Sequence, residues 1–376
     1  MPIAIDCNYP GGNVLLRGID GDRIVVAQDI RDTTEWWFWW NFRVRGAAGR
    51  TLRVEFDDEV GPVGPNGPAM STNRRSWRWA WQADGRGPCS AHDVHGFTIA
   101  VPPDADTVYF AFSFPYQLED WERFVAPHRA CPDVRADVLT TTRAEREAPR
   151  VRIGDPEAAD RNVLFTCRHH ACECVASYVL EGAMAFILSS EADALRRTTA
   201  FTVVPLVDLD GVEAGDQGKL RAPRDHNADY GEGSVHPTVQ AMKRLIDDLS
   251  HRRLAILLDF HCPWIRNAEN EATFLVEPPE PYAAHARQFG EMLRRVNDSP
   301  IPYTGKRDVP SGTSWNVPKP GRVTSGGYAR LKDAGALLTS LTLETSYSLS
   351  EGAVVTPEAA RDLGRCVARA VELFLS

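Results

Sequence analysis

The sequence predicts an α/β fold with a mixed, mostly parallel central sheet flanked by helices, preceded by an all-β sandwich domain. Two observations carry this prediction. The first hundred or so residues alternate polar and apolar side chains with a period of two, and turn residues interrupt them. From about Leu118 onward, short continuous apolar runs alternate with helices of period 3.6. We therefore expect two domains, residues 1–117 and residues 118–376.

Short strands are expected in the first domain at residues 13–16, 23–26, 50–56, 97–101 and 107–114. The aromatic run TEWWFWWNFRVRG is the most distinctive of its segments. Strand alternation places on one face Trp36, Phe38, Trp40, Phe42 and Val44. It places on the other face Trp37, Trp39, Asn41, Arg43 and Arg45. The first face is typical of a sandwich interior, whereas outward tryptophans would suit a sugar-stacking or partner surface.

In the second domain, AFTVVPLVD and LAILLDFH are nearly continuous apolar runs, as in strands buried on both faces of a parallel sheet. The segment HPTVQAMKRLIDDL carries an apolar stripe at helical spacing. The last helix is expected to begin with Thr356 as its cap and Pro357 in its first turn. A Gly/Ser/Pro-rich segment over residues 303–328 predicts a long loop and a candidate wall of a binding site.

Composition excludes several classes of function. The 376 residues carry a net charge of −9 and no basic stripe, which argues against nucleic-acid binding. No window approaches 18 uninterrupted apolar residues, so we expect no membrane span. The start MPIAIDCNYPGG lacks the features of a signal peptide. Eight cysteines in a chain of this length do not predict a dense disulfide framework. We expect a reduced, cytoplasmic protein.

The segment RHHACECVASYVLEG, residues 168–182, concentrates side chains that bind metals. A structural zinc site from Cys167, Cys172 and Cys174 is unsupported, because the C-x-x-C spacing and a second Cys/His pair are missing. His170 and Glu173 are a better pair, since an i, i+3 spacing on the first turn of a helix sets them side by side.

Two further residues extend this pair. His261 ends a buried strand at its carboxyl end, where open α/β sheets build their sites. A single histidine at such a position is more often a core residue. Because the same half of the chain also carries the H-x-x-E pair, His261 is a candidate third ligand. Glu344, in LTSLTLETSYS, lies on the strand face opposite Leu341 and Leu343, so it must be paired, metal-associated or catalytic. Asp259 would share a strand face with His261 and orient its ring.

In this order, the H-x-x-E pair, VPLVDLDGV, DHN, LDFH and LTLETS resemble the zinc metallocarboxypeptidase family. The leading domain, with WWFWWNFRVRGAAGRTL and FSFPY, resembles the cytosolic carboxypeptidase branch and its bacterial relatives. The resemblance implies one zinc ion bound by His170, Glu173 and His261, with His169 only a neighbour. It also implies hydrolysis of a peptide or amide bond at the C-terminus of a peptide or protein by zinc-activated water, with Glu344 as general base.

These residue types suit that chemistry independently of the resemblance. Zinc held by two histidines and one glutamate lowers the pKa of bound water toward ~7 and polarises a carbonyl. A neighbouring carboxylate can accept the proton of that water and later pass it to the leaving amine.

The segment GDQGKLRAPRDHNADYG departs from the family. There an Asn followed by Arg grips the substrate's terminal carboxylate, whereas here Asn227 is followed by Ala228. A guanidinium gives a carboxylate two charge-assisted bonds and alanine gives none. Three explanations remain open. Another cation of this loop, Lys219, Arg221 or Arg224, fills the role; the substrate lacks a terminal carboxylate, as for a zinc amidase or acyl-amino-acid hydrolase; or Ala228 is an engineered or drifted change that cripples activity.

A rival from another class is a non-catalytic protein that binds peptides or glycans through the β domain or the emptied pocket. The presence of Glu344 together with all three candidate ligands argues against it, because a degenerate site would be expected to lose them first.

Overall fold

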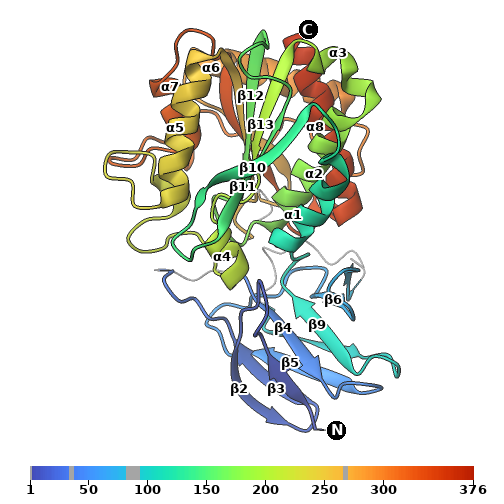
Figure 1. Cartoon of the computed structure of the whole chain (residues 1–376). Helices are drawn as coiled ribbons and strands as arrows, with labels where there is room; N and C mark the ends of the chain where they lie inside the picture. The colour runs from blue at the N-terminus through green and yellow to red at the C-terminus, as the bar shows by residue number, and fades with distance from the viewer. Residues whose placement is uncertain (1, 34–37, 82–93, 266–269) are drawn as a thin grey trace.

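The computed structural model describes residues 2–33, 38–81, 94–265 and 270–376. An all-β part formed by the N-terminal segment lies at one end of the molecule, and an α/β part forms the other (Figure 1). Strand β9, Thr107–Ala111, ends the β part, and helix α1 begins at Leu118. These bounds lie on either side of the predicted division between residues 117 and 118. That the two parts are independent domains stays a prediction.

The β part contains two sheets. One has the order β1-β4-β9-β6-β7 and the other β2-β3-β5-β8. The strands of the first are β1 Ala4–Asp6, β4 Asn41–Arg45, β6 Ala69–Ser71, β7 Arg78–Trp79 and β9. Those of the second are β2 Leu15–Asp20, β3 Arg23–Ala27, β5 Thr51–Phe56 and β8 Gly96–Ala100.

Aromatic rings from both sheets fill the space between them. The Trp40 ring lies 4.9 Å from that of Phe56 and 6.1 Å from that of Phe97, centroid to centroid. Phe97 in turn lies 5.2 Å from Phe110. Trp40 directly precedes β4, which belongs with β9 to one sheet, whereas β5 and β8 belong to the other, so these rings join the sheets. The predicted sandwich interior is confirmed for Trp40, Phe42 and Val44, all fully buried. Phe38 is also buried, but its ring packs on Phe112, Trp264 and Tyr347, at the junction with the α/β part.

The outward position expected for Trp39 is wrong. Its side chain is only 2 % exposed, and its indole Nε1 donates to the Gly11 carbonyl. The reason is that β4 begins at Asn41, so the strand alternation that would turn Trp39 outward does not reach it. Trp36 and Trp37 lie outside the described residues.

The α/β part is built on a seven-stranded sheet of order β10-β11-β13-β12-β14-β16-β15. Its strands are β10 Val134–Thr141, β11 Glu147–Ile153, β12 Arg161–Cys167, β13 Thr199–Val204, β14 Leu254–His261, β15 Thr273–Val276 and β16 Thr339–Thr345. The central strands β13, β12, β14 and β16 are mutually parallel, and β10, β11 and β15 extend the edges antiparallel. This confirms the predicted mixed sheet with a parallel centre.

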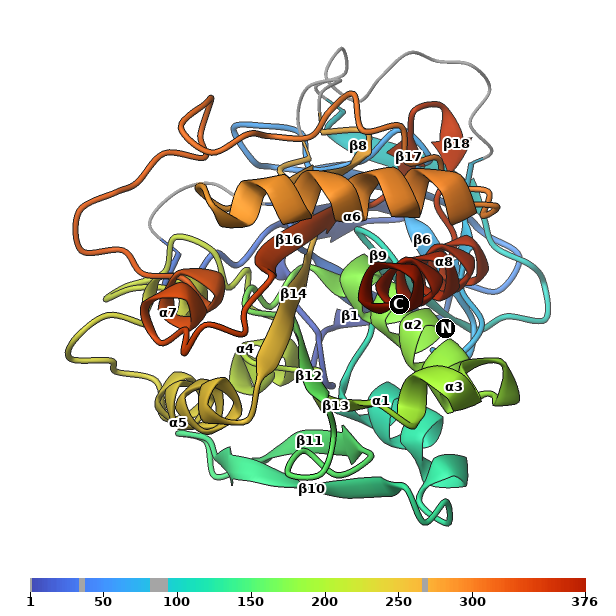
Figure 2. The ribbon, with the colours of Figure 1, turned by 90° about the horizontal axis from the view of Figure 1, so that it is seen from above.

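Helices cover both faces of this sheet. Seen along the sheet, α5 and α7 lie on one side and α2 and α8 on the other (Figure 2). The helices are α1 Leu118–Val125, α2 Cys174–Leu188, α3 Asp193–Arg196, α4 Leu209–Ala214, α5 Pro237–His251, α6 Tyr282–Val296, α7 Ser325–Leu331 and α8 Pro357–Leu375. Thr356 caps α8 as expected, accepting from the Ala359 amide. A Cβ on Gly182 of α2 would collide with the backbone of α8, which explains the glycine there.

The structure also bears on the predictions made for the cysteines and for a membrane span. The cysteines that the structure describes, at positions 7, 131, 167, 172, 174, 262 and 366, are all free. Among the described helices none is by itself long and apolar enough to cross a membrane. Helix α2 and the following segment Ser190–Arg196, which are bent by 66° relative to each other, would together be long and apolar enough, by length and composition alone.

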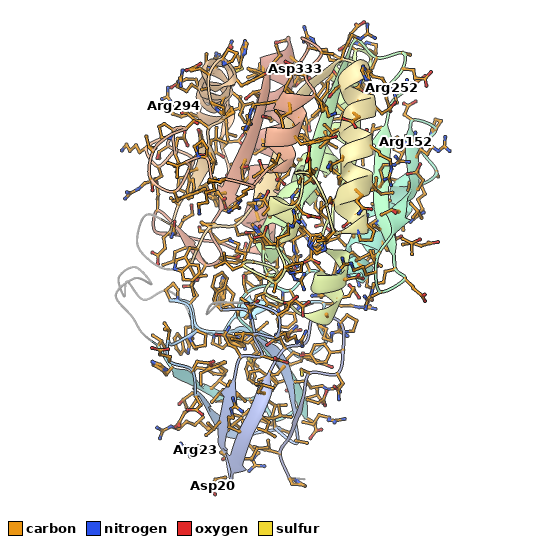
Figure 3. All side chains as sticks on the ribbon, turned by 90° about the vertical axis from the view of Figure 1, so that its left-hand side faces the viewer. Asp20, Arg23, Arg152, Arg252, Arg294 and Asp333 are labelled. Carbon is orange, nitrogen blue, oxygen red and sulfur yellow. The ribbon has the colours of Figure 1, made fainter. Side chains whose placement is uncertain are left out.

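The β part packs on two segments that also carry the candidate site. Gln217 exchanges two hydrogen bonds with the Trp39 backbone, at 2.7 and 2.8 Å. Ser113 donates to the Tyr347 carbonyl, and the Tyr347 ring also packs on Phe38 and Phe112. In Figure 3, by contrast, the labelled Asp20 and Arg23 lie at the far tip of the β part, opposite Arg252 and Asp333. The base of the β part therefore holds the loops next to the site.

Candidate active site

The candidate site lies where three neighbouring parallel strands end. The chain leaves β12 at Cys167 and enters the turn 168–173 before α2. His261 is the last residue of β14, and it pairs in register with Glu344 of β16. Parallel strands bring their carboxyl ends to one edge of a sheet, so segments about 170 residues apart in sequence meet there.

The three candidate ligands converge on one point. His170 Nδ1 lies 2.9 Å from Glu173 Oε1, and His261 Nδ1 lies 2.8 Å from Glu173 Oε2. The ligand atoms of these three buried residues all lie within 4.8 Å of one another. Among the described residues, Glu173 Oε2 has no hydrogen-bond partner despite its close nitrogen neighbour. Unshared electron pairs that face each other in this way suit a cation between them.

The expected helical setting of His170 and Glu173 is wrong. Helix α2 begins at Cys174, and both residues lie in the turn before it. The chain must change direction between strand and helix, and Arg168 adopts a positive φ of 59° to do so. The Cys172 amide then donates to the Gln217 carbonyl. Contacts with another loop therefore shape this turn.

Asp259 contacts the imidazole of His261 from the outer side. Its Oδ2 lies 3.0 Å from His261 Nε2, while its Oδ1 accepts from Thr166 Oγ1 at 2.8 Å and meets His169 Nδ1 at 2.9 Å. Ser325 Oγ also donates to Oδ2. Burial alone would raise the pKa of Asp259, but the charges of His169 and His261 lower it. An ionised carboxylate here fixes which nitrogen of His261 faces the centre.

A second group also converges, from His169, Asp259 and His261. Both ring nitrogens of His169 have other partners, however. Nδ1 bonds Asp259, and Nε2 lies 2.7 Å from the Tyr230 hydroxyl. The partners of its ring nitrogens favour His170, Glu173 and His261 as the ligand group, and the role of His169 as a neighbour stays a prediction.

Glu344 stands at the centre with a free oxygen. Its side chain is buried, and its Oε2 has no hydrogen-bond partner within the described ranges. Burial raises the pKa of Glu344 to about 7, although the nearby charge of His261 opposes the rise. A carboxyl group with such a pKa can both accept and release a proton near neutral pH.

The three cations proposed for the substrate side lie in different surroundings. Lys219 Nζ lies 2.6 Å from Glu173 Oε1 and donates to the Cys262 carbonyl, which brings its charge to the centre. Arg221 forms ion pairs with three carboxylates, those of Asp32, Asp208 and Asp216.

Arg224 pairs with Asp229 and donates to the Gly233 carbonyl. The amide oxygen of Asn227 is buried without a hydrogen-bond partner in the described part of the chain. The roles of these residues toward a substrate stay predictions.

Sequence reasoning missed Asp225. It is buried, its Oδ1 lies 3.9 Å from His170 Nε2, and the same oxygen accepts from the Ala228 amide. Its place in the DHN motif is the sequence signal that could have identified it as a site residue. Thr166, Ser325 and Tyr230 were also missed, and single hydroxyl groups at scattered positions give no sequence signal.

Both parts of the chain are similar to known proteins. The family model described as zinc carboxypeptidase matches residues 124–244, and the one for the cytosolic carboxypeptidase N-terminal domain matches residues 5–113. Cytosolic carboxypeptidase 3 of Mus musculus is 30% identical over 179 residues, which cover 44% of this chain and 18% of that protein. Cytosolic carboxypeptidase 2 of Danio rerio is 30% identical over 189 residues, covering 44% and 25%.

Solved structures extend the likeness to the whole chain. A metallo-carboxypeptidase from Burkholderia cenocepacia superposes with a TM-score of 0.80 at 19% identity, covering 100% of this chain and 99% of that one. One from Pseudomonas aeruginosa, in complex with (2-guanidinoethylmercapto)succinic acid, gives a TM-score of 0.76 at 14% identity, with 99% of each chain covered. At these identities the likeness concerns the fold, which is that of the metallo-carboxypeptidases.

Residues 124–244 of the α/β part thus match the zinc carboxypeptidase family, and residues 5–113 of the β part match the N-terminal domain of its cytosolic branch. The chain spans only about a fifth to a quarter of the length of the first curated relatives it matches.

Proposed function

We propose that this protein is a zinc-dependent carboxypeptidase that hydrolyses the last peptide or amide bond of a peptide or protein. The observation that carries the proposal is the convergence of two Nδ1 atoms on the two Glu173 oxygens, with Glu344 opposite His261 in the strand register and its Oε2 unpaired among the described residues. Two histidines and one glutamate form the ligand set of catalytic zinc sites, which leave a position open.

His170, Glu173 and His261 would hold the ion, and their burial and spacing fit it. Zinc supplies a Lewis acid that polarises the scissile carbonyl and makes water more acidic. Asp259, within 3.0 Å of His261 Nε2, keeps His261 Nδ1 facing inward. These residues position the reacting groups and keep them from moving, which lowers the entropy cost of reaction.

Glu344 would act as general base. Its free Oε2 accepts a proton from the attacking water and then delivers it to the leaving amine. The charge of Lys219, already 2.6 Å from Glu173, would stabilise the negative charge that develops on the carbonyl oxygen. Asn227 would contact the substrate through its unpaired amide.

Mass spectrometry of a peptide pool tests this proposal. Each sequence is present with a free and with an amidated C-terminus, and the zinc-loaded protein is compared with Glu344→Gln. We expect stepwise loss of C-terminal residues, slowed by about 10²- to 10⁴-fold in the variant because the proton acceptor is lost. Equal zinc content in both proteins is the control. Hydrolysis that survives chelation of zinc would refute the proposal.

A second candidate function rests on one observation, namely Ala228 in the position where the family has arginine. A zinc amidase or acyl-amino-acid hydrolase would need no cation for a terminal carboxylate. The same pool distinguishes it, because such an enzyme would cleave free and amidated peptides equally well. Unchanged biological activity in Glu344→Gln would instead favour a non-catalytic binding protein.

We propose a cytoplasmic location, because the curated relatives are named cytosolic carboxypeptidases. The partner would then be a peptide or a protein tail with an accessible C-terminus.

A further inference from the structure

We propose that Arg322, from the long loop before α7, binds the substrate's terminal carboxylate and so takes the place of the arginine missing at position 228. This inference rests on the proposed function and names the residue that would restrict it to free C-termini. No sequence spacing points to Arg322, which lies 94 residues beyond Ala228.

Backbone pairing places Arg322 next to Ala228. Val323 and Asp229 form a parallel β-bridge, and the Tyr230 amide donates to the Val323 carbonyl at 3.1 Å. Arg322 directly precedes Val323, and Ala228 directly precedes Asp229. The register of the bridge therefore brings Arg322 and Ala228 opposite each other. The approach continues at Gly231, where a Cβ would lie 3.7 Å from Val323 Cγ2. In Figure 2 the long connection from α6 runs along the rim of the molecule and ends at α7.

The segment that Arg322 faces adjoins the centre. Asp225 accepts from the Ala228 amide, and its Oδ1 lies 3.9 Å from His170 Nε2. Asn227, whose buried amide oxygen has no hydrogen-bond partner among the described residues, belongs to the same short segment. The bridge between Asp229 and Val323 therefore sets Arg322 beside the segment that lines the substrate side of the centre.

The other cations of this region are engaged. Lys219 pairs with Glu173, Arg221 with three carboxylates, and Arg224 with Asp229. By contrast, the exposed side chain of Arg322 makes no hydrogen bond or ion pair within residues 2–33, 38–81, 94–265 and 270–376. An exposed guanidinium presents two parallel N–H donors, which match a carboxylate. A carboxylate from the substrate is the partner whose chemistry fits.

Such a carboxylate has two sources, the chain terminus and an acidic side chain at the last residue. Three matched peptides distinguish them: a neutral last residue with a free terminus, the same peptide amidated, and an amidated peptide ending in glutamate. We expect the zinc-loaded protein to prefer the first. In Arg322→Ala, kcat/KM for the free-acid peptide should fall by about 10²-fold, with little change for the amidated ones.

Arg307→Ala is the matched control. It removes another exposed arginine from the same loop, at the end bridged to β15 through Val309, and should leave all three rates unchanged. The double variant Arg322→Ala/Ala228→Arg provides the rescue. It returns a guanidinium to the facing segment and should restore at least a tenfold preference for the free terminus.

Binding gives a readout that does not depend on turnover. Acetyl-phenylalanine and its amide are titrated calorimetrically into the zinc-loaded wild type, Arg322→Ala and Arg307→Ala. Arg322→Ala alone should lose the preference for the acid. Equal loss in both variants, an unchanged preference in Arg322→Ala, or a preference for the glutamate-ended amide would each overturn the proposal. Wild-type cleavage of acids and amides at equal rates would also overturn it and leave zinc-dependent hydrolysis standing, whereas no cleavage at all would count against the proposed function itself.

Discussion

The two sides of the site are built in different ways. On the metal side, His261 and Glu344 come from the carboxyl ends of β14 and β16, and His170 and Glu173 come from the turn that follows β12. His261 stands opposite Glu344 because the two parallel strands pair there. On the substrate side, Asn227 and Arg322 come from irregular segments that single bridges join, such as Asp229 to Val323. The strand ladder fixes the neighbours of His261 and Glu344, whereas the turn of His170 and Glu173 and the whole substrate side depend on loop contacts.

This difference explains where the chain has kept and where it has changed the pattern of its family. A substitution among the strand-end residues leaves a buried charge without its partner, which is costly. A loop residue such as Ala228 can change if another loop brings a side chain with the same chemistry to the same place. We therefore expect substitutions on the metal side to have large effects on zinc binding and stability, and substitutions in the loops to have smaller, separable effects.

The largest effect is expected for Glu173→Gln. The carboxylate balances the charge of Lys219 at 2.6 Å and meets both histidines, so a neutral amide leaves a buried ammonium without its partner. We expect zinc to be absent after dialysis and the metal-free protein to be destabilised by about 3–5 kcal/mol. Elemental analysis and urea unfolding measure the two effects. Glu277→Gln, another buried carboxylate, is the control and should keep one equivalent of zinc.

A smaller effect is expected for Asp259→Asn. The amide can still accept from Thr166, but it lacks the charge that holds His261 and His169. Loss of a carboxylate that orients a metal-bound histidine typically weakens metal binding by about 10- to 100-fold. Competition with a zinc chelator of known affinity measures this change. An unchanged affinity would show that β14 alone orients His261.

The smallest effect concerns Asp308, which secures the start of the long loop. It accepts from the Leu275 amide at 2.8 Å and from the Tyr303 hydroxyl at 2.7 Å. Burial raises the pKa of Asp308 to about 6. Between pH ~4 and 6 the folded chain keeps a proton that the unfolded chain has released. The free energy of unfolding therefore falls as the pH rises through this window, by about 2–3 kcal/mol at most.

Urea unfolding at pH 4.5 and 7.5 checks this prediction. Asp308→Asn cannot titrate, so the stability difference between wild type and variant should move in favour of the variant at the higher pH. A difference that is the same at both pH values would mean that Asp308 does not titrate in this window.

The sequence by itself determined the order of the elements and the candidate metal side. Period-two and continuous apolar patterns separated the β part from the α/β part, and the residue pairs His170/Glu173 and His261/Glu344 marked the ends of segments that the fold brings together. These signals are local, because each is a residue type at a fixed spacing within one strand or turn.

Only the tertiary structure decided the rest. The burial of Trp39, the turn that holds His170 before α2, and the partners of Arg221 and Arg224 depend on contacts between distant segments. The position of Arg322 opposite Ala228 is of the same kind, since one β-bridge between two loops creates it. Irregular segments have no periodic pattern from which such a meeting could be read, and so their partners are defined only once the chain has folded.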